Sequence, residues 1–421
     1  MRLTAAFGDD ADVIRDTDLQ LLLLANTLGP MGSAVLSPVL DSLIGPFGAS
    51  EASIGLVISV FTAPAIVMIP LVGVLTDRYG RKPILVAGLL LYGIAGTAIA
   101  LTTEFRMVLL LRFIQGVGFA GINPVIITAI GDLYRGDAEA TAQGFRFTES
   151  GLTQVLFPLL SGALIALAWY WPFLLYAIAF PIALLVGLFF EEPMPAADRG
   201  TAADGGETGT IGALLALVKN RRVLAMVLAR GFPVIAWIGF LTYNSILVVR
   251  VLGGTPVDAG LLVATGSLTW AAAASQAGRL SAAFDSRATL LVVSNGALGV
   301  GLLGFAFAPG LAVAGLGVAL MGAGFGVVMS LYRSIITAMA PPRLRGRLVS
   351  LGESFGRVTG TLTPVAMGAT IGLLSSTVGF ATSVRIAAIG AGLVAGGVGI
   401  LLILVAAAAA PPADQPEAKA F

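Results

Sequence analysis

Long apolar runs separated by short polar segments dominate the chain, and this pattern predicts its structural elements. A helix needs about 20 apolar residues to cross a bilayer. Twelve runs in the sequence reach this length. They are residues 19–40, 53–75, 83–102, 107–132, 140–167, 171–190, 222–249, 257–278, 288–308, 310–333, 347–374 and 380–408. The pattern predicts an all-α membrane protein with twelve transmembrane helices.

One polar segment is much longer than the others and divides the runs into two sets of six. Residues 191–221 are small, polar and rich in Pro and Gly, which predicts a flexible cytoplasmic loop. We expect an N-terminal six-helix bundle over 19–190 and a C-terminal bundle over 222–408. Residues 1–18 are acidic and are followed by no small-residue cleavage site, so we interpret them as a cytoplasmic tail. Residues 409–421 form the second predicted cytoplasmic tail.

Composition narrows the class of protein further. The chain is 57% hydrophobic and 11% charged, whereas soluble chains carry about 25% charged residues. The net charge of +1 argues against a nucleic-acid partner. The sequence has no Cys and no His, which removes the usual zinc ligands and the commonest general base. We therefore expect a lipid-embedded protein without a metal site or a cofactor, and not an enzyme.

The distribution of basic residues predicts the orientation of the chain, because Lys and Arg in short loops mark the cytoplasmic side. With both termini inside, 17 Lys and Arg residues fall in inner loops and tails. Three fall in outer loops, namely Arg106, Arg250 and Arg385. This bias favours an even number of spans with both termini cytoplasmic.

The two predicted bundles are weak copies of each other. Gly278-Arg279-Leu280 follows the eighth span as Gly73-Val74-Leu75 follows the second, although Ala282 stands where Asp77 would repeat. Acid and arginine pairs recur near the cytoplasmic ends of the fifth and eleventh spans: Arg146 with Glu149, and Glu353 with Arg357. Duplicated halves joined by a polar loop are typical of transporters with a central path between the halves.

Two sequence motifs in the chain resemble those of a known protein family. Residues 73–85, GVLTDRYGRKPIL, match the loop motif G-x-L-a-D-R-x-G-R-[RK] of the major facilitator superfamily. Residues 112–120, RFIQGVGFA, resemble the motif R-x-x-Q-G-x-G-x-A that proton-coupled members carry in the fourth span. The chain is similar to the twelve-span drug-proton antiporter type. The resemblance implies two pseudo-symmetric six-helix bundles that work by alternating access, in a monomer of the cell (plasma) membrane.

The fifth span departs from the pattern of the drug-proton exporters. These usually carry G-x-x-x-G-P-x-x-G-G there, and the corresponding stretch here is residues 153–162, TQVLFPLLSG. Pro158 and Gly162 remain, whereas Thr153, Phe157 and Ser161 replace glycines. This difference weakens the assignment to exporters and leaves the superfamily resemblance intact.

The loop at residues 73–85 has two compatible interpretations. It is a topology signal with a tight turn, and it is also a conformational latch that holds the outward-facing state. Glycines allow close backbone approach and a tight turn, and we expect Asp132 at the inner end of the fourth span to pair with Arg78 or Arg81. The predicted latch residues are Gly73, Asp77, Arg78, Gly80, Arg81 and Asp132.

Glu149 is the first candidate for carrying a proton, because it lies about nine residues inside the fifth span. The alternative is a static pair with Arg146 that serves helix packing. Arg112 is a costly charge within the fourth span, predicted either to couple protons to substrate or to snorkel outward. Glu353 and Asp41 are further proton candidates, with a structural pair to Arg357 and an interfacial position as their alternatives.

Polar and soft side chains predict the substrate cavity. In the seventh span, Arg230, Trp237 and Asn244 recur at intervals of seven and share one helix face. Gln115 lies on the same face of the fourth span as Arg112. The remaining candidates are Asn26, Met31 and Asn123, in helices that line the path in this family. Ordinary helix packing is the alternative for each of them.

These predictions combine into one function and one nearest alternative. We expect proton-coupled export of a small hydrophobic or amphipathic compound, with protons, the compound and the lipid bilayer as the partners. Proton-coupled uptake of a small metabolite is the alternative that the altered fifth-span motif keeps open. A channel is less consistent with a latch loop.

Overall fold

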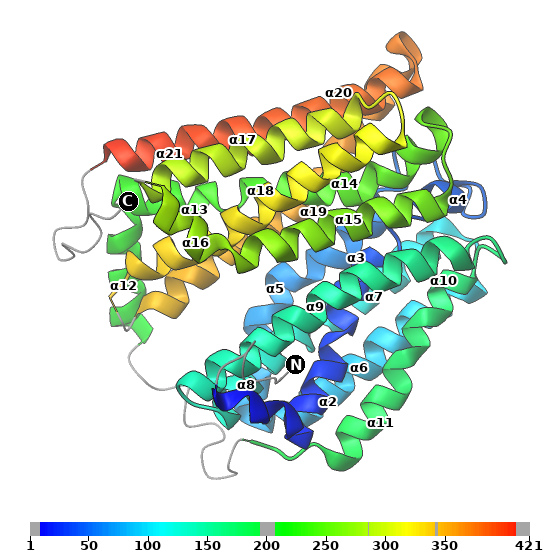
Figure 1. Cartoon of the computed structure of the whole chain (residues 1–421). Helices are drawn as coiled ribbons and strands as arrows, with labels where there is room; N and C mark the ends of the chain where they lie inside the picture. Colours follow the sequence, from blue (N-terminus) through cyan, green and yellow to red (C-terminus); the bar gives the residue numbers. More distant parts are fainter. Residues whose placement is uncertain (1–8, 194–206, 285, 342–343, 410–421) are drawn as a thin grey trace. The chain divides into compact units, whose positions relative to one another are not determined.

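The computed structural model describes residues 9–193, 207–284, 286–341 and 344–409. Every regular element in these ranges is a helix (Figure 1). The outer parts of both predicted tails, at residues 1–8 and 410–421, lie outside the described residues, as do residues 194–206 of the predicted central loop. The all-α prediction is confirmed.

Ten helical stretches of the described residues are long and apolar enough to cross a membrane. They correspond to ten of the twelve predicted spans. The predicted fifth span is the 28-residue helix α9, Asp137–Leu164, which is long enough at about 42 Å but more polar. The predicted first span is divided into short helices. Both differences are compatible with a twelve-span protein.

Two compact units make up the chain, and each has its own packing. The first comprises the described residues of Met1–Leu36, Gly45–Ala49 and Val60–Gly205. The second comprises those of Ser37–Ile44, Ser50–Ser59 and Gly206–Phe421. The N-terminal unit therefore lacks two short segments of the predicted bundle over 19–190, and these segments pack with the C-terminal unit.

The helices of the first half run in chain order from η1 to α11. They are η1 Asp9–Arg15, α2 Thr17–Asn26, α3 Leu28–Ala34, α4 Leu40–Ile44, α5 Leu56–Tyr79, α6 Arg81–Ala98, η2 Ile99–Leu101, α7 Phe105–Ala120, α8 Asn123–Leu133, α9, α10 Trp171–Leu174, η3 Leu175–Ile178 and α11 Ala179–Phe189. Within the N-terminal unit, α6 packs against both α7 and α11, and α9 packs against α2 and α3.

The helices of the second half run from α12 to α21. They are α12 Glu207–Val218, α13 Arg221–Ala229, α14 Phe232–Ile246, η6 Leu247–Val251, α15 Pro256–Ser275, α16 Ala277–Ala283, α17 Arg287–Ala306, α18 Leu311–Ala338, α19 Arg345–Val378, α20 Phe380–Leu393, η8 Val394–Val398 and α21 Gly399–Ala408. In the C-terminal unit, α18 packs between α15 and α17 (Figure 1), and α19 packs against α14 and α20.

Prolines explain the breaks within the predicted spans. A proline has no N–H and cannot bond to the carbonyl four residues earlier, so a helix can end there. Helix α2 ends at Asn26, four residues before Pro30, and α3 ends at Ala34, four residues before Pro38. Helix α7 likewise ends at Ala120, four residues before Pro124. Helix α13 ends at Ala229, four residues before Pro233. The break after Asn26 matters most, because it lies at a polar site.

The central segment contains a helix where the sequence predicted only a loop. Helix α12 covers Glu207–Val218. Its apolar residues Leu214, Leu217 and Val218 pack against a core cluster of the C-terminal unit that includes Met226. Burial of this short apolar run, which the overall polar composition of 191–221 obscured, accounts for the difference.

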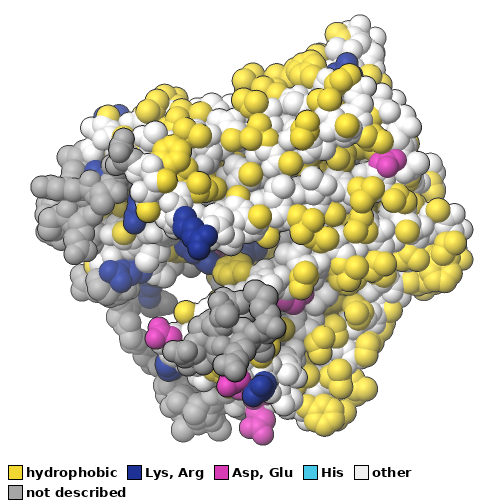
Figure 2. All heavy atoms as spheres, viewed as in Figure 1, with side chains coloured by type: hydrophobic (Ala, Val, Ile, Leu, Met, Phe, Trp, Pro, Cys, Tyr) yellow, Lys and Arg dark blue, Asp and Glu magenta, His cyan; other side chains and the backbone are white. Residues whose placement is uncertain are grey.

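Hydrophobic side chains are spread over the protein surface drawn in Figure 2, and charged side chains are few there. Exposed residues on the long helices include Val67, Leu152, Leu316 and Leu373. Such a surface is compatible with lipid rather than with water. It agrees with the multi-pass membrane protein that the sequence predicts.

Candidate transport sites

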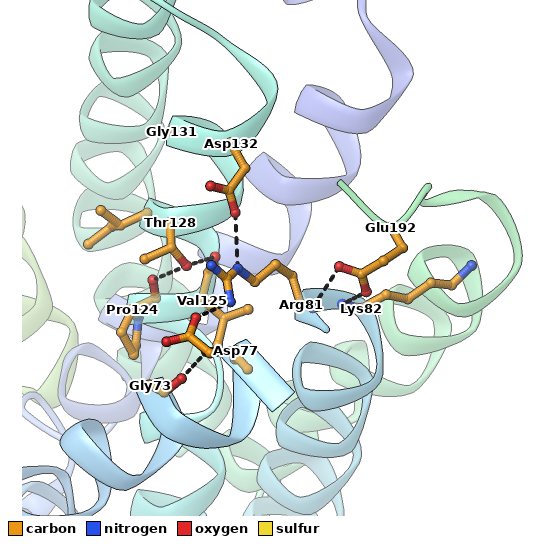
Figure 3. A network of polar contacts seen from close by, with 12 residues as sticks. Gly73, Asp77, Arg81, Lys82, Pro124, Val125, Thr128, Gly131, Asp132 and Glu192 are labelled. Carbon is orange, nitrogen blue, oxygen red and sulfur yellow. Dashed lines mark hydrogen bonds and ion pairs between the residues drawn. The ribbon is translucent and has the colours of Figure 1, made fainter. Parts of the chain in front are cut away.

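Arg81 is the centre of a charged network in the predicted latch (Figure 3). Its Nε donates to Asp132 Oδ2 at 3.0 Å, and its Nη1 donates to Asp77 Oδ1 at 2.7 Å. The Arg81 side chain is 9% exposed, so both ion pairs are partly shielded from water. The sequence left Arg78 and Arg81 open as partners of Asp132, and in the structure the partner is Arg81. The Arg78 guanidinium lies 5.4 Å from the Tyr79 ring instead.

Glu192 is a part of this network that the sequence did not predict. Its carboxylate accepts hydrogen bonds from the backbone N–H groups of Arg81 and Lys82, at 2.8 and 2.9 Å (Figure 3). These N–H groups begin α6, where a negative charge is favourable. The network therefore joins the ends of α5, α6 and α8 to the residues that follow α11.

The two glycines of the predicted latch differ in backbone conformation and in the space around them. Gly80 is the single residue between α5 and α6, and its φ of +99° favours glycine. A Cβ there would also lie 2.5 Å from Glu192 Oε2. Gly73 lies inside α5, and a Cβ there would meet nothing within 4 Å. The predicted close approach is therefore present at Gly80 and wrong at Gly73.

Glu149 is held by uncharged hydrogen-bond donors. Thr153 Oγ1 and Thr27 Oγ1 donate to Glu149 Oε1 at 2.6 and 2.8 Å. Asn26 Nδ2 donates to Glu149 Oε2. Asn26 ends α2 and Thr27 is the residue of the helix break, so the break that Pro30 causes brings two donors to one carboxylate.

Arg146 makes other contacts, although the sequence offered it as a partner of Glu149. Its Nε donates to Gln143 Oε1 at 2.8 Å, and its guanidinium carbon lies 4.4 Å from the centre of the Phe147 ring. Its carbonyl accepts from Asn26 Nδ2 at 3.3 Å. Asn26 also reaches Ser150 Oγ at 2.7 Å and is 2% exposed. Asn26 thus lies in the Glu149 cluster rather than on an open cavity wall.

The residues that break the exporter pattern in the fifth span have structural partners. Thr153 donates to Glu149, and Ser161 Oγ donates to the carbonyl of Val35. Phe157 is buried. Two of the three substitutions therefore add polar contacts inside the N-terminal unit, one of them at the candidate proton site.

Arg112 is completely buried, which makes the predicted snorkelling wrong. Its Nη2 donates to the carbonyl of Gly32 at 2.7 Å, and its Nη1 donates to Gln115 Oε1 at 2.6 Å. Its guanidinium carbon lies 4.3 Å from the centre of the Phe61 ring. Gly32 allows this arrangement, since a Cβ there would lie 2.1 Å from Phe61 Cζ. Arg112 is therefore fixed by a backbone carbonyl, an amide and an aromatic face.

Glu353 pairs with arginines other than the one four residues away. It accepts from Arg230 Nη2 and from Arg333 Nη2, both at 3.1 Å. Among the described residues, Arg357 forms no ion pair with it. The predicted Glu353–Arg357 pair is therefore wrong in its partner, because the packing of α13, α18 and α19 brings two other arginines closer.

Asp41 belongs to an ion cluster of the C-terminal unit. Arg250 Nε donates to Asp41 Oδ1, and Arg250 Nη1 donates to Glu51 Oε1. The Asp41 backbone N–H donates to Ser245 Oγ at 2.9 Å. This arrangement favours the interfacial interpretation of Asp41 over a proton role.

The other predicted cavity residues mostly pack inside their units. The Trp237 ring stacks on Phe325 with centroids 5.2 Å apart. Asn244 Nδ2 donates to the carbonyl of Ala259 at 2.9 Å, and Met31 is fully buried. These contacts favour packing for the three residues. Asn123 is half-buried at the start of α8 and remains a candidate.

Thr27, Ser150 and Arg333 are further site residues that the sequence did not predict. Hydroxyl residues are common in membrane helices, and nothing in the sequence distinguishes Thr27 or Ser150 from the others. Arg333 is the last residue of the predicted tenth span and is one of the 17 basic residues assigned to inner loops and tails, whereas in the structure it lies inside α18. Its spacing of 20 residues from Glu353 gives no local signal, because the two residues lie on different helices.

The helices and their buried charges define a multi-pass membrane transporter. The chain belongs to the Major Facilitator Superfamily, whose family model matches residues 22–364. This membership confirms the resemblance found in the sequence and identifies a transporter rather than an enzyme.

Several relatives match part of the chain. A bacillibactin exporter of Bacillus subtilis (strain 168) is 38% identical over 34% of this chain and 36% of its own length. A multidrug transporter MdfA of Edwardsiella piscicida is 27% identical over 55% of this chain and 56% of its own. A class H tetracycline resistance protein of Pasteurella multocida is 30% identical over 41% of this chain and 44% of its own length. The chain thus covers about a third to somewhat over half of the length of these relatives.

Solved structures match nearly the whole chain at low identity. A bacterial homologue of the human lysosomal transporter Spinster, inward-facing and occupied, has a TM-score of 0.78 and 17% identity over 94% of this chain and 98% of its own. A D-xylose–proton symporter has a TM-score of 0.75 and 17% identity over 96% of this chain and 98% of its own. At these identities the likeness concerns the fold alone.

Proposed function

We propose that this transporter exports a small hydrophobic or amphipathic compound in exchange for protons, by alternating access. The observation that carries the proposal is the Glu149 cluster, a carboxylate inside a membrane helix whose hydrogen bonds come from Asn26, Thr27 and Thr153. Ionisable groups within spans are costly and commonly serve ion pathways. The names of the relatives, an exporter and drug-resistance transporters, support the outward direction.

Uncharged donors suit a proton carrier better than a fixed ion pair does. An arginine bonded to the carboxylate would hold it as an anion. Hydroxyl groups can turn, donating to a carboxylate and accepting from a carboxylic acid, so the cluster keeps its hydrogen bonds in both forms. Glu149 is therefore the proton carrier in this proposal, and Arg112, fixed on Gly32 in the same unit, couples the proton to the substrate.

The Arg81 network is the latch in this proposal. Asp77, Arg81 and Asp132 join α5, α6 and α8, and Glu192 joins them to the end of α11. One buried cation between two carboxylates gives a discrete contact that a change of state would break or form. We place both termini and this network on the cytoplasmic side of the plasma membrane, following the bias of basic residues, and we propose that the monomer is the working form.

Transport in proteoliposomes tests the proposal. A pH gradient is imposed, internal pH is followed with an entrapped fluorescent dye, and ethidium, tetracycline and chloramphenicol are supplied from either side. We expect a compound to move against the proton flux through the wild type, with Glu149→Gln at background. Movement in the same direction as protons would instead support uptake by symport, the alternative that the altered fifth-span motif keeps open.

A matched control separates a coupling defect from a folding defect. Asp137→Asn changes an exposed acid in the first turn of the same helix, and we expect wild-type flux from it. Flux independent of the pH gradient, or wild-type flux through Glu149→Gln, would contradict the proton mechanism.

A further inference from the structure

The C-terminal unit holds a cluster with more positive than negative charge. Arg230 follows α13, Arg333 lies in α18, and Glu353 and Arg357 lie one turn apart in α19. Glu353 bonds to Arg230 and Arg333. Arg333 and Arg357 both lie close enough to Arg230 for their charges to repel it. Three arginines therefore lie around the carboxylate of Glu353.

Burial makes the charge of Arg230 costly, because its side chain is 13% exposed. The side chain of Glu353 is 31% exposed, and Arg333, at 46%, lies on the exposed side of the cluster. An ionised group away from water needs a partner, and an excess arginine in a membrane protein usually marks a functional site. Arg357 is half-buried and makes no hydrogen bond or ion pair with any residue that the structure describes.

The donors in the cluster are incompletely used. Arg230 Nη1 donates to the carbonyl of Gly352 at 3.2 Å and Nη2 donates to Glu353, whereas its buried Nε has no partner among the described residues. A guanidinium carries five N–H donors that suit planar anionic groups such as carboxylate and phosphate. The cluster thus offers an anion more donors than Glu353 accepts.

Two glycines of α19 lie against Arg230. A Cβ at Gly352 would lie 3.2 Å from Arg230 Cδ, and one at Gly356 would lie 3.4 Å from Arg230 Nη1. The glycines therefore leave space for this arginine. The same two segments of chain carry the apolar residues Phe232 and Phe355, whose ring centres are 6.0 Å apart.

We propose that Arg230, Arg333 and Arg357 bind the anionic group of the transported compound, an organic acid with an apolar or aromatic body. Glu353 holds Arg230 and Arg333 in place and competes with the incoming carboxylate, phosphate or sulfonate. This inference rests on the proposed function in taking the chain to carry a small compound, and it adds the charge of that compound. Glu353 then has a role in binding substrate rather than in carrying protons.

Binding to the full-length protein in detergent tests the inference without a proton gradient. Isothermal titration compares 2-naphthoate, phenyl phosphate and the neutral 2-naphthamide. We expect the anions to bind at least tenfold more tightly than the amide. Arg357→Gln should weaken anion binding by about tenfold to a hundredfold, the range of one charge-assisted hydrogen bond, and leave the amide unchanged.

Two further variants sharpen the test. Arg347→Gln removes an exposed arginine in the first turns of the same helix and should bind anions like the wild type. Glu353→Gln removes the competing carboxylate and should tighten anion binding severalfold, a gain that loss of structure would not produce. Equal binding of acid and amide, absence of binding by every anion, or equal effects of Arg357→Gln and Arg347→Gln would overturn the proposal.

A lipid headgroup carries the same chemistry as a free anion, so its contribution is measured separately. Thermal unfolding is compared in phosphatidylcholine nanodiscs with and without phosphatidylglycerol. If phosphatidylglycerol stabilises the wild type but not Arg357→Gln, and the soluble anions do not bind, the site serves lipid and the substrate assignment is wrong. Anion binding without proton-driven flux would instead contradict the proton mechanism alone.

Discussion

Glu149 and Glu353 occupy related places in the two halves, and their surroundings are opposite. Glu149 accepts hydrogen bonds from Asn26, Thr27 and Thr153, none of which carries a charge. Glu353 accepts from Arg230 and Arg333. The hydroxyl and amide groups around Glu149 can bond to a carboxylic acid as well as to a carboxylate, whereas the arginines around Glu353 form ion pairs with a carboxylate.

This contrast indicates how two related six-helix halves can acquire different functions. The sequence pairs each acid with a nearby arginine in the same helix, and in neither half does the structure give the acid its main contacts from that arginine. Asn26 and Thr27 from outside α9 bond to Glu149 together with Thr153 of the same helix, and the partners of Glu353 both come from other helices. We infer that the N-terminal unit handles the proton and the C-terminal unit handles a charge on the substrate.

The largest expected effect is at Glu149. Glu149→Gln keeps the shape and the hydrogen-bonding capacity of the side chain but cannot exchange a proton, so proton-driven flux should fall at least about a hundredfold, to background. Glu353→Gln should reduce the same flux much less. Dye-monitored flux in proteoliposomes measures both, and equal losses would remove the contrast between the two acids.

The next effect concerns the proposed latch, whose Asp77 is replaced by Ala282 at the corresponding position of the second half. Asp77→Asn removes one of the two carboxylates on Arg81, a charge-assisted hydrogen bond worth about 1.5–3 kcal/mol when shielded and less here, because Asp77 is partly exposed. We expect unchanged membrane insertion and a transport rate about tenfold lower. Lys82→Gln, which changes charge in the same loop but leaves the Arg81 pairs intact, should transport normally. Full transport by Asp77→Asn would exclude the latch.

A smaller effect should follow from one hydroxyl group beside Glu149. Thr153→Val removes a donor to the ionised carboxylate, so the proton should bind more tightly and the pH of half-maximal transport should rise by about one unit. The pH profile of flux measures this shift. Thr148→Val is a control in the same helix, since Thr148 is exposed and its hydroxyl donates to the carbonyl of Gly144 rather than to Glu149. An unmoved profile for Thr153→Val would argue against Glu149 as the titrating group.

The smallest effect is expected at the Asp41 cluster. Arg250→Gln removes two partly exposed ion pairs worth about 1 kcal/mol together, which corresponds to a Tm lower by about 1–2 °C for a chain of 421 residues. Arg106→Gln, at an exposed arginine of another predicted outer loop, should leave the Tm unchanged. Thermal unfolding in detergent distinguishes the two, and a loss of proton coupling in Arg250→Gln would reopen a proton role for Asp41.

Most of the fold followed from the sequence, and much of the candidate sites did not. The lengths of apolar runs predicted the membrane helices. The stretch at 73–85 predicted the family and an ion pair between Asp132 and Arg78 or Arg81. The helix break at Asn26 was missed, although Pro30 carries its physical cause. The partners of Glu353 could not be predicted, because a membrane helix is apolar on its lipid-facing and protein-facing sides alike and gives no periodic signal of its rotation.

The sequence by itself determined which segments enter the membrane, because transfer free energy depends on the composition of each run and little on its neighbours. It also determined the family, through residues 73–85. Only the tertiary structure decided that Asn26 and Thr27 meet Glu149 and that Arg333 meets Glu353. Those contacts depend on the register and rotation of packed helices, which are set by many small contacts between distant parts of the chain.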